Sequence, residues 1–242
     1  MKCWIIGYDP GGNNNHGVAA LEVHAETGRW IAEQLMVGQE STVGQVKKWF
    51  ERVCAGGRIV AVGIDTLTEW NDGSAGWRPA DLELRSKYRK KKEVVDSVVH
   101  PNYISGAMSL NGAILLLSLA ERFQRDGTII TEAHPKVCFF ALTKKVAKET
   151  SLVEMTRWLL DELSVPQPNE GFGSSDHAFD AAMATLAALR GINGDWALDL
   201  HTLTNDTCGE RVLPFGPTYY WWPGNAEEEA IPRMPEQLQE KQ

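Results

Sequence analysis

Residues 3–23, CWIIGYDPGGNNNHGVAALEV, decide the fold that we expect for this chain. An apolar run that starts at Cys3 leads to Asp9, and the Gly- and Asn-rich residues 10–16 cannot continue as a helix. Residues 17–23 then resume the pattern of a strand. An acidic side chain at the end of a buried strand is costly unless it has a partner, and a metal ion is a common one. We therefore predict that Asp9 is a metal ligand.

The composition is that of a globular protein with a full core, and its charge is acidic. The 242 residues carry a formal net charge of −8, which disfavours a protein that coats nucleic acid by charge alone. Six of the 24 basic residues fall within residues 85–92, so one basic patch stands in an otherwise acidic chain. Such a patch can locate a strand of nucleic acid, and its plainer reading is a solvated basic face.

Cysteine usage and the apolar runs predict the compartment. The four cysteines form no CxxC pair, which argues against a zinc ribbon or a disulfide framework and for a reducing compartment. The apolar start is too short for a signal peptide, and the longest apolar run, residues 113–120, cannot span a bilayer. We expect a soluble, cytoplasmic protein with no membrane partner, and a homo-oligomer stays open.

The order of the elements predicts an α/β fold. Strands are expected over residues 17–23 and 30–37 after the first, then over 58–64 and 128–131. The connections put three antiparallel strands first and two parallel strands after them, in a mixed five-stranded sheet with helices on both faces. The first expected helix begins after the cap Ser41 and ends at Gly56, and two others are expected over 106–123 and 151–163. The last runs over 176–190, with Ser175 as its cap and Gly191 as the residue that ends it.

The domain organisation follows from these elements. Residues 1–223 are expected to form one domain, with residues 66–104 as an insert beside the site, because that stretch is too long for a plain connection. Residues 215–223 are aromatic and predict an edge strand over the core. The polar residues 224–242 are expected to be a disordered tail.

Acidic residues gather at the places where the predicted strands end. Asp65 follows the buried strand RIVAVGI, parallel to the first strand, so Asp9 and Asp65 should emerge at one edge of the sheet. Asp180 lies in the second turn of a helix that is apolar all round, and Asp176 is four residues before it on the same face. Glu132 ends the next strand and is a fourth ligand or a neighbour of the ligands. Three to five carboxylates of this kind suit Mg²⁺ or Mn²⁺. Each could instead cap a turn or meet a basic residue.

The expected substrate contacts are basic residues near that edge: Arg78, Arg85, Lys87 and His134. They are of the kind that holds phosphates, whereas a structural histidine and a solvated basic face are the plainer alternatives.

The wider set of motifs resembles a known family. GYDPGG, GVAALEV, VGIDT, RPADLELR, TEAHPKVCF and DHAFDAAMATLAAL occur in this order, and YYWWP follows them. This set resembles domain-of-unknown-function family 429, described as a predicted RNase H-like nuclease. The resemblance implies an RNase H-like fold and a metal site on Asp9, Asp65 and Asp180 with Glu132 or Asp176. It also implies Arg78, Asp81 and Arg85 in the insert beside the site.

The expected function is hydrolysis of phosphodiester bonds in nucleic acid with Mg²⁺ or Mn²⁺ as cofactor. Asp9, Asp65 and Asp180 would be the catalytic residues, and the type of nucleic acid stays open. Three alternatives remain: a nucleotide-phosphate enzyme of the actin and sugar-kinase kind, a non-catalytic binding module of the same fold, and a hydrolase of a small phosphorylated metabolite.

Overall fold

The computed structural model of the chain describes residues 1–12, 15–73, 76–98, 106–168, 172, 175–206 and 208–224. Within these residues the predicted sheet is present, with five strands in the order β3-β2-β1-β4-β6. Its strands are β1 (Cys3–Asp9), β2 (His16–Glu26), β3 (Arg29–Glu40), β4 (Arg58–Ile64) and β6 (Ile129–Glu132). β1 to β3 pair antiparallel, while β4 is parallel to β1 and β6 is parallel to β4. The predicted fold class, a mixed α/β sheet with three antiparallel and two parallel strands, is confirmed.

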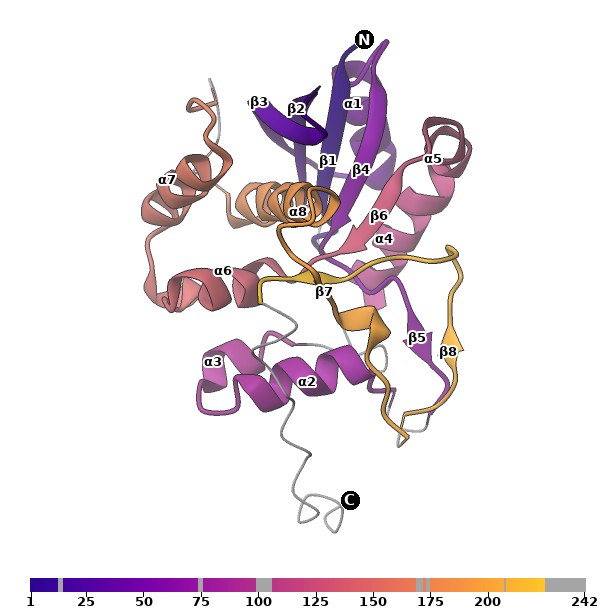
Figure 1. Cartoon of the computed structure of the whole chain (residues 1–242), viewed down its shortest axis with the longest axis vertical. Coiled ribbons are helices and arrows are strands. Elements are labelled where there is room, and N and C mark those ends of the chain that lie inside the picture. The colour runs from indigo at the N-terminus through magenta and orange to yellow at the C-terminus, as the bar shows by residue number, and fades with distance from the viewer. Residues whose placement is uncertain are drawn as a thin grey trace.

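Helices lie on both faces of this sheet (Figure 1). The described helices are α1 (Val43–Val53), α2 (Pro79–Lys87), α3 (Lys92–Val95), α4 (Gly106–Ser118), α5 (Ala120–Asp126), α6 (Pro135–Thr143), α7 (Leu152–Leu163) and α8 (Asp176–Ile192), with short 3₁₀ turns at Ala147–Glu149 and Leu200–Thr202. Of these, α2 and α3 lie beyond the ends of the strands and not on a face of the sheet (Figure 1).

Alternation along the strands divides the core in two. Ile5 of β1 belongs to the cluster that holds α6, α7 and α8, whereas Trp4, Ile6 and Tyr8 belong to the cluster that holds α1, α4 and α5. Successive side chains of a strand point to opposite faces, so one buried strand supplies both clusters. This is why the central strands are apolar throughout.

Helix α8 lies directly against the sheet because glycines face it. A Cβ on Gly7 would lie 2.0 Å from the Ala181 carbonyl oxygen, and one on Gly63 would lie 1.9 Å from that of Ala184. Gly17 is equally close to the carbonyl of His177. Without side chains at these three positions, the backbone of α8 approaches three neighbouring strands. The approach brings the second turn of α8 to the carboxyl ends of β1 and β4.

The structure corrects several predicted helix boundaries. Thr42, not Ser41, caps α1, since its side chain accepts from the backbone N–H of Gln45, and α1 ends at Val53 before the glycines. The expected helix over 106–123 is interrupted at Leu119 into α4 and α5. Ser151 caps α7 as predicted, whereas the side chain of Ser175 makes no capping bond to α8.

Two further elements differ from the prediction. Helix α8 continues past Gly191 to Ile192, and α6 was not predicted at all. The aromatic C-terminal stretch does cover an edge of the sheet. Tyr219 forms a parallel bridge with Thr131 of β6, and β9 (Trp221–Trp222) pairs with β7 (Leu198–Asp199).

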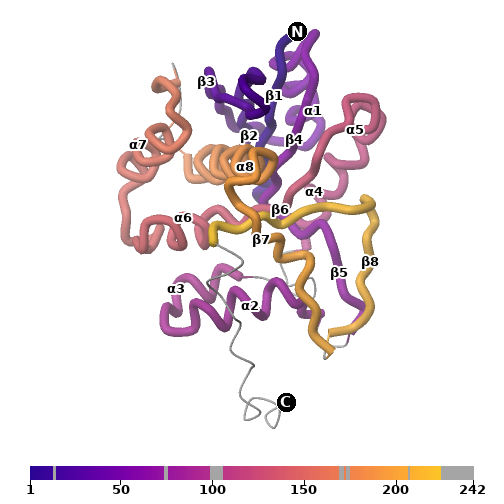
Figure 2. The backbone as a smooth tube through the Cα atoms, viewed as in Figure 1, coloured from indigo at the N-terminus to yellow at the C-terminus, as the bar shows by residue number. Residues whose placement is uncertain are grey.

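The insert over 66–104 is ordered in the part that the structure describes. It contains β5 (Trp70–Asn71), α2 and α3, and β5 pairs with β8 (Arg211–Val212), so the insert joins the C-terminal segment (Figure 2). His100, Pro101 and the predicted tail from residue 225 lie outside the described residues. The division into a domain over 1–223 and a tail stays a prediction. Among the described helices, none combines the length and the apolar character that crossing a bilayer requires.

Candidate metal centre

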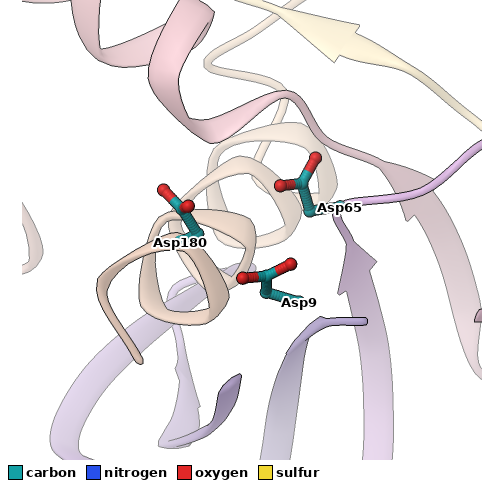
Figure 3. Close-up of side chains that lie close together, drawn as sticks. All are labelled: Asp9, Asp65 and Asp180. Carbon is teal, nitrogen blue, oxygen red and sulfur yellow. The ribbon is translucent and has the colours of Figure 1, made fainter. Parts of the chain in front are cut away.

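Three carboxylates that are far apart in the sequence come together at the carboxyl ends of β1 and β4. Asp9 is the last residue of β1, Asp65 follows β4, and Asp180 lies in the second turn of α8. One carboxylate oxygen from each lies within 4.8 Å of the others, and Figure 3 shows the three side chains beside one another. Asp9 and Asp180 are each only 2% exposed.

The backbone fixes two of these carboxylates. Asp9 pairs with Gly17 in the register of β1 and β2, and the N–H of Asp65 donates to the carbonyl of Tyr8 at 2.9 Å. This bond extends the pairing of β1 and β4 by one residue beyond β4. The two side chains therefore project from adjacent strands at one level of the sheet.

Asp180 is held on one side only. Its Oδ2 lies 3.1 Å from Nζ of Lys136, whereas its buried Oδ1 has no hydrogen-bond partner among the described residues. A buried carboxylate oxygen without a partner carries a large desolvation cost. It is the kind of atom that a cation would satisfy.

Asp9 has a histidine partner from α8, the helix that also carries Asp180. Nδ1 of His177 lies 2.5 Å from Oδ2 of Asp9, and this contact fixes the orientation of the carboxylate. The hydrogen bond to Asp9 raises the pKa of His177, which favours the protonated ring. Asp9 thus has one oxygen tied to His177.

Burial and mutual repulsion dominate the electrostatics of the three carboxylates. Burial raises the pKa of Asp9 to about 6; the neighbouring Asp65 charge adds to the shift, and the bond from His177 opposes it. Burial likewise raises the pKa of Asp180 well above its ordinary value, although Lys136 opposes the shift. Groups that resist ionisation together are stabilised as anions when a cation joins them.

Lys136 is a second cationic group beside this cluster, next to Asp180 as His177 is next to Asp9. Burial by itself favours its neutral form, but the Asp180 carboxylate raises its pKa above the ordinary value, so the ammonium is retained. Its Nζ also lies 3.6 Å from Asp176, whose side chain is mostly exposed. Asp176 is therefore beside the cluster and is not one of the three converging carboxylates.

Glu132, expected as a fourth ligand or a neighbour of the ligands, is paired with a buried arginine. Its two oxygens lie 2.6 and 2.7 Å from the guanidinium of Arg78, and it accepts from the backbone N–H of Thr68. Arg78 also donates to Asp81, and its side chain is 2% exposed. The donors of Arg78 and the oxygens of Glu132 are thus occupied by each other and their neighbours. That Arg78 contacts substrate and that Glu132 is a metal ligand or a neighbour of the ligands therefore stay predictions, and the structure pairs the two side chains with each other.

The other expected substrate contacts have different placements. Arg85 donates to the carbonyls of Val95 and Val98 and stacks on Trp77, so its side chain is engaged within the insert. Lys87 is exposed at the end of α2, with its ammonium 6.0 Å from the ring centre of Tyr88. His134 lies at the site, where its Nδ1 is 3.6 Å from Oδ1 of Asp65. Of the four, His134 alone contacts one of the three carboxylates.

Sequence reasoning missed Lys136 and His177, although signals for both exist. His177 is three residues before Asp180, a spacing that puts both on one face of α8. Lys136 follows a proline that stands at the first position of a helix, next to the end of β6. A helix starting there brings its first turn to the same edge of the sheet as Asp9 and Asp65.

The residues present fit a hard divalent cation. All three converging groups offer carboxylate oxygens, which Mg²⁺ and Mn²⁺ prefer, and the unpaired Oδ1 of Asp180 is already desolvated. The role of these residues as metal ligands stays a prediction.

Comparisons with known proteins place the chain in a family. Two solved structures are similar to the chain. "Thermus thermophilus RuvC structure" is 14% identical with a TM-score of 0.41, and the match covers 78% of this chain and 95% of that one. "T. thermophilus RuvC in complex with Holliday junction substrate" is 13% identical with a TM-score of 0.43, and the match covers 86% of this chain and 98% of that one. No curated protein matches the chain at a significant level. One family model matches residues 7–198, most of the chain. The chain belongs to the family described as "Protein of unknown function (DUF429)".

Proposed function

We propose that this protein is a divalent-metal-dependent nuclease that hydrolyses phosphodiester bonds in nucleic acid. The observation that carries the proposal is the convergence of Asp9, Asp65 and Asp180 within 4.8 Å, with one oxygen of Asp180 buried and unpaired. A bound Mg²⁺ or Mn²⁺ would supply charge stabilisation for the pentavalent transition state and lower the pKa of an attacking water.

The chain's own residues have distinct tasks in this reaction. Hydrolysis joins the oxygen of water to phosphorus, breaks one P–O ester bond and delivers a proton to the departing oxygen. His177 holds the Asp9 carboxylate in one orientation. The Lys136 ammonium offsets part of the negative charge and can donate to a phosphate oxygen. His134, partly exposed and 3.6 Å from Asp65, would give a proton to the leaving oxygen.

A nuclease assay tests the proposal directly. Purified protein is incubated with Mg²⁺ or Mn²⁺ and a panel of linear and branched DNA and RNA, with EDTA as a control. We expect cation-dependent cleavage that falls about a hundredfold or more in Asp9→Asn and in Asp65→Asn. Asp161→Asn makes the same chemical change at an exposed position of α7 and should cleave normally.

Two results would count against the proposal. Cleavage that persists undiminished in Asp9→Asn would point to a contaminant or another site. Absence of any cation-dependent change in melting temperature, together with absence of cleavage, would favour the non-catalytic binding module instead.

A further inference from the structure

A cavity of about 330 Å³ lies beside Asp65, one of the three carboxylates, and beside Lys136, which pairs with Asp180. Its lining includes Asp65 and three buried residues at the ends of β4 and β6, namely Thr66, Glu132 and Ala133. The volume lies near the lower end of the roughly 300–1,000 Å³ of small-molecule sites, which suits a single nucleotide unit and not a longer segment. The cavity is thus a compartment continuous with the proposed metal centre.

The cationic groups that line the cavity come from one segment of the chain, the start of α6 and the 3₁₀ turn that follows it. His134, Pro135 and Lys136 line it as the start of α6, and Lys148 of the following 3₁₀ turn joins them. The amino end of a nine-residue helix adds a partial positive charge to the two ammonium groups. Glu132, which also lines the cavity, is neutralised by Arg78. Asp65 and Asp96 also line the cavity, and Lys136 is paired with Asp180, so charge complementarity favours a phosphate on the side of Lys148.

The rest of the lining suits a base. Leu67 and Met108 give apolar surface, while Asp96, Ser97 and Ser109 offer hydrogen-bonding groups for a base edge. Bases in a duplex remain stacked and paired, so they cannot enter a cavity of this kind, whereas an unpaired nucleotide can turn into it.

We propose that this cavity binds one unpaired nucleotide next to the scissile phosphate, so that the substrate is single-stranded or locally unpaired nucleic acid. The inference rests on the proposed function, because the phosphate that is cleaved must lie at the three carboxylates. Lys148 holds a phosphate of the seated nucleotide or of its neighbour. Free nucleoside monophosphates share this chemistry, and the experiment separates the two sources.

The experiment compares a short single-stranded oligonucleotide, a blunt duplex of the same sequence and a nucleoside monophosphate. Cleavage is measured with Mn²⁺, and binding is measured in the Asp9→Asn background, which is not expected to cleave. We expect the single strand to be bound and cleaved at least about tenfold better than the duplex. The monophosphate should bind more weakly than the strand because it offers a single phosphate.

Two variants and one matched control test the cavity itself. Ser109→Trp fills the space from the first turn of α4 and should weaken single-strand binding about tenfold. Lys148→Ala should reduce the slope of log affinity against log salt by about 0.7, the effect of losing one phosphate contact. Lys145→Ala removes a neighbouring exposed lysine that does not line the cavity, and should leave the slope unchanged. In the wild-type background, Mn²⁺ should raise the melting temperature of all three variants by as much as we expect for the wild type.

The outcomes separate this inference from the function on which it rests. Equal cleavage of duplex and single strand, with Ser109→Trp and Lys148→Ala unaffected, would overturn the cavity assignment and leave a nuclease. If no substrate is cleaved, the proposed function fails, and the binding arm still decides about the cavity. Loss of strand binding in both variants then supports it, and unchanged binding rejects it. Should Ser109→Trp not fold, the salt slope of Lys148→Ala gives the answer alone. Tight binding of the monophosphate and none of the strand would reassign the cavity to free nucleotides.

Discussion

The aspartate at the end of β1 is a residue that the fold holds at a cost to stability. Asp9 is buried beside Asp65 and Asp180, and burial raises its pKa to about 6. In Asp9→Asn the amide keeps an oxygen for His177 and brings an N–H toward its acidic neighbours. In EDTA at neutral pH or above we therefore expect this variant to be more stable than the wild type by about 1–3 kcal/mol, against the usual direction for a core substitution.

The same variant should lose its response to cations. Mn²⁺ should raise the melting temperature of the wild type and have little effect on Asp9→Asn, because a ligand that binds only the folded state stabilises it by an amount that grows with the logarithm of its concentration over its Kd. Differential scanning calorimetry with and without Mn²⁺ measures both effects, with Asp161→Asn as the charge-matched control. A destabilised Asp9→Asn that still responds to Mn²⁺ would mean that Asp9 is a structural cap.

Helix α8 is the element that completes the cluster, and its position depends on bare backbone in the sheet. In Gly63→Ala the new methyl would lie 1.9 Å from the carbonyl oxygen of Ala184, a distance that the rigid backbone cannot absorb without moving α8. We expect a loss of about 1–3 kcal/mol or more in the free energy of unfolding. Because Asp180 moves with the helix, the stabilisation by Mn²⁺ should fall as well.

A glycine elsewhere provides the control for that substitution. Gly12 has open space where a Cβ would stand, so Gly12→Ala should change neither the denaturant midpoint nor the response to Mn²⁺. Chemical denaturation of both variants with and without the cation gives the comparison. Equal stability of Gly63→Ala and the wild type would show that α8 is not seated on the sheet as described.

Elements with strong local signals could be predicted from the sequence, and those fixed by tertiary contacts could not. The strands were predictable because β1 and β4 are apolar on both faces and the others are bounded by turns. No glycine or proline predicts the break between α4 and α5 at Leu119. Helix α6 is rich in aromatic and β-branched residues, so its pattern gives no helical period.

The candidate site shows the same division. The convergence of Asp9, Asp65 and Asp180 could be predicted because a carboxylate at the end of a buried strand or inside a buried helix needs a partner. The burial of Arg78 against Glu132 could not be foreseen, since it depends on how the insert folds back onto the end of β6. Partners 54 residues apart give no local signal.

At the scale of the whole molecule, a buried ionic cluster joins three segments that are distant in sequence. Arg78 and Asp81 come from the insert, Glu132 from the sheet, and His201 from the C-terminal segment. Glu69 completes the cluster through His201 and Arg211. Removing one partner of a buried pair leaves the others uncompensated, so Arg78→Met should destabilise the protein by about 3–5 kcal/mol. The double variant Arg78→Met, Glu132→Gln should recover part of that loss.

The cluster also predicts how stability depends on pH. Burial alone would lower the pKa of His201, but its contacts with Glu132 and Glu69 raise it above the ordinary value. A histidine with a raised pKa stabilises the fold fully below its unfolded value of about 6.5, and that contribution disappears as the pH rises through the folded value. Glu132 behaves oppositely, because burial alone would raise its pKa but Arg78 holds that pKa well below the ordinary range. Its contribution to stability is therefore present above about pH 4.3, the unfolded value, and is lost as the pH falls into the acid range. Stability from this cluster should therefore be greatest between roughly pH 4.3 and 6.5.

His201→Gln isolates the alkaline side of that profile. The amide cannot take up a proton, so the fall in stability that the wild type shows from pH 6.5 upward should be reduced in this variant, while the fall in acid remains. Urea denaturation across the pH range measures the difference between the two proteins. EDTA excludes cation binding, and the titration of Asp9, Asp180 and His177 is common to both proteins and cancels in the difference. His24→Gln changes an exposed histidine near Glu33 and should leave the profile unaltered. Parallel profiles for the wild type and His201→Gln would show that the pKa of His201 is the same in the folded and unfolded protein, so that its contacts with Glu132 and Glu69 do not contribute to the pH dependence.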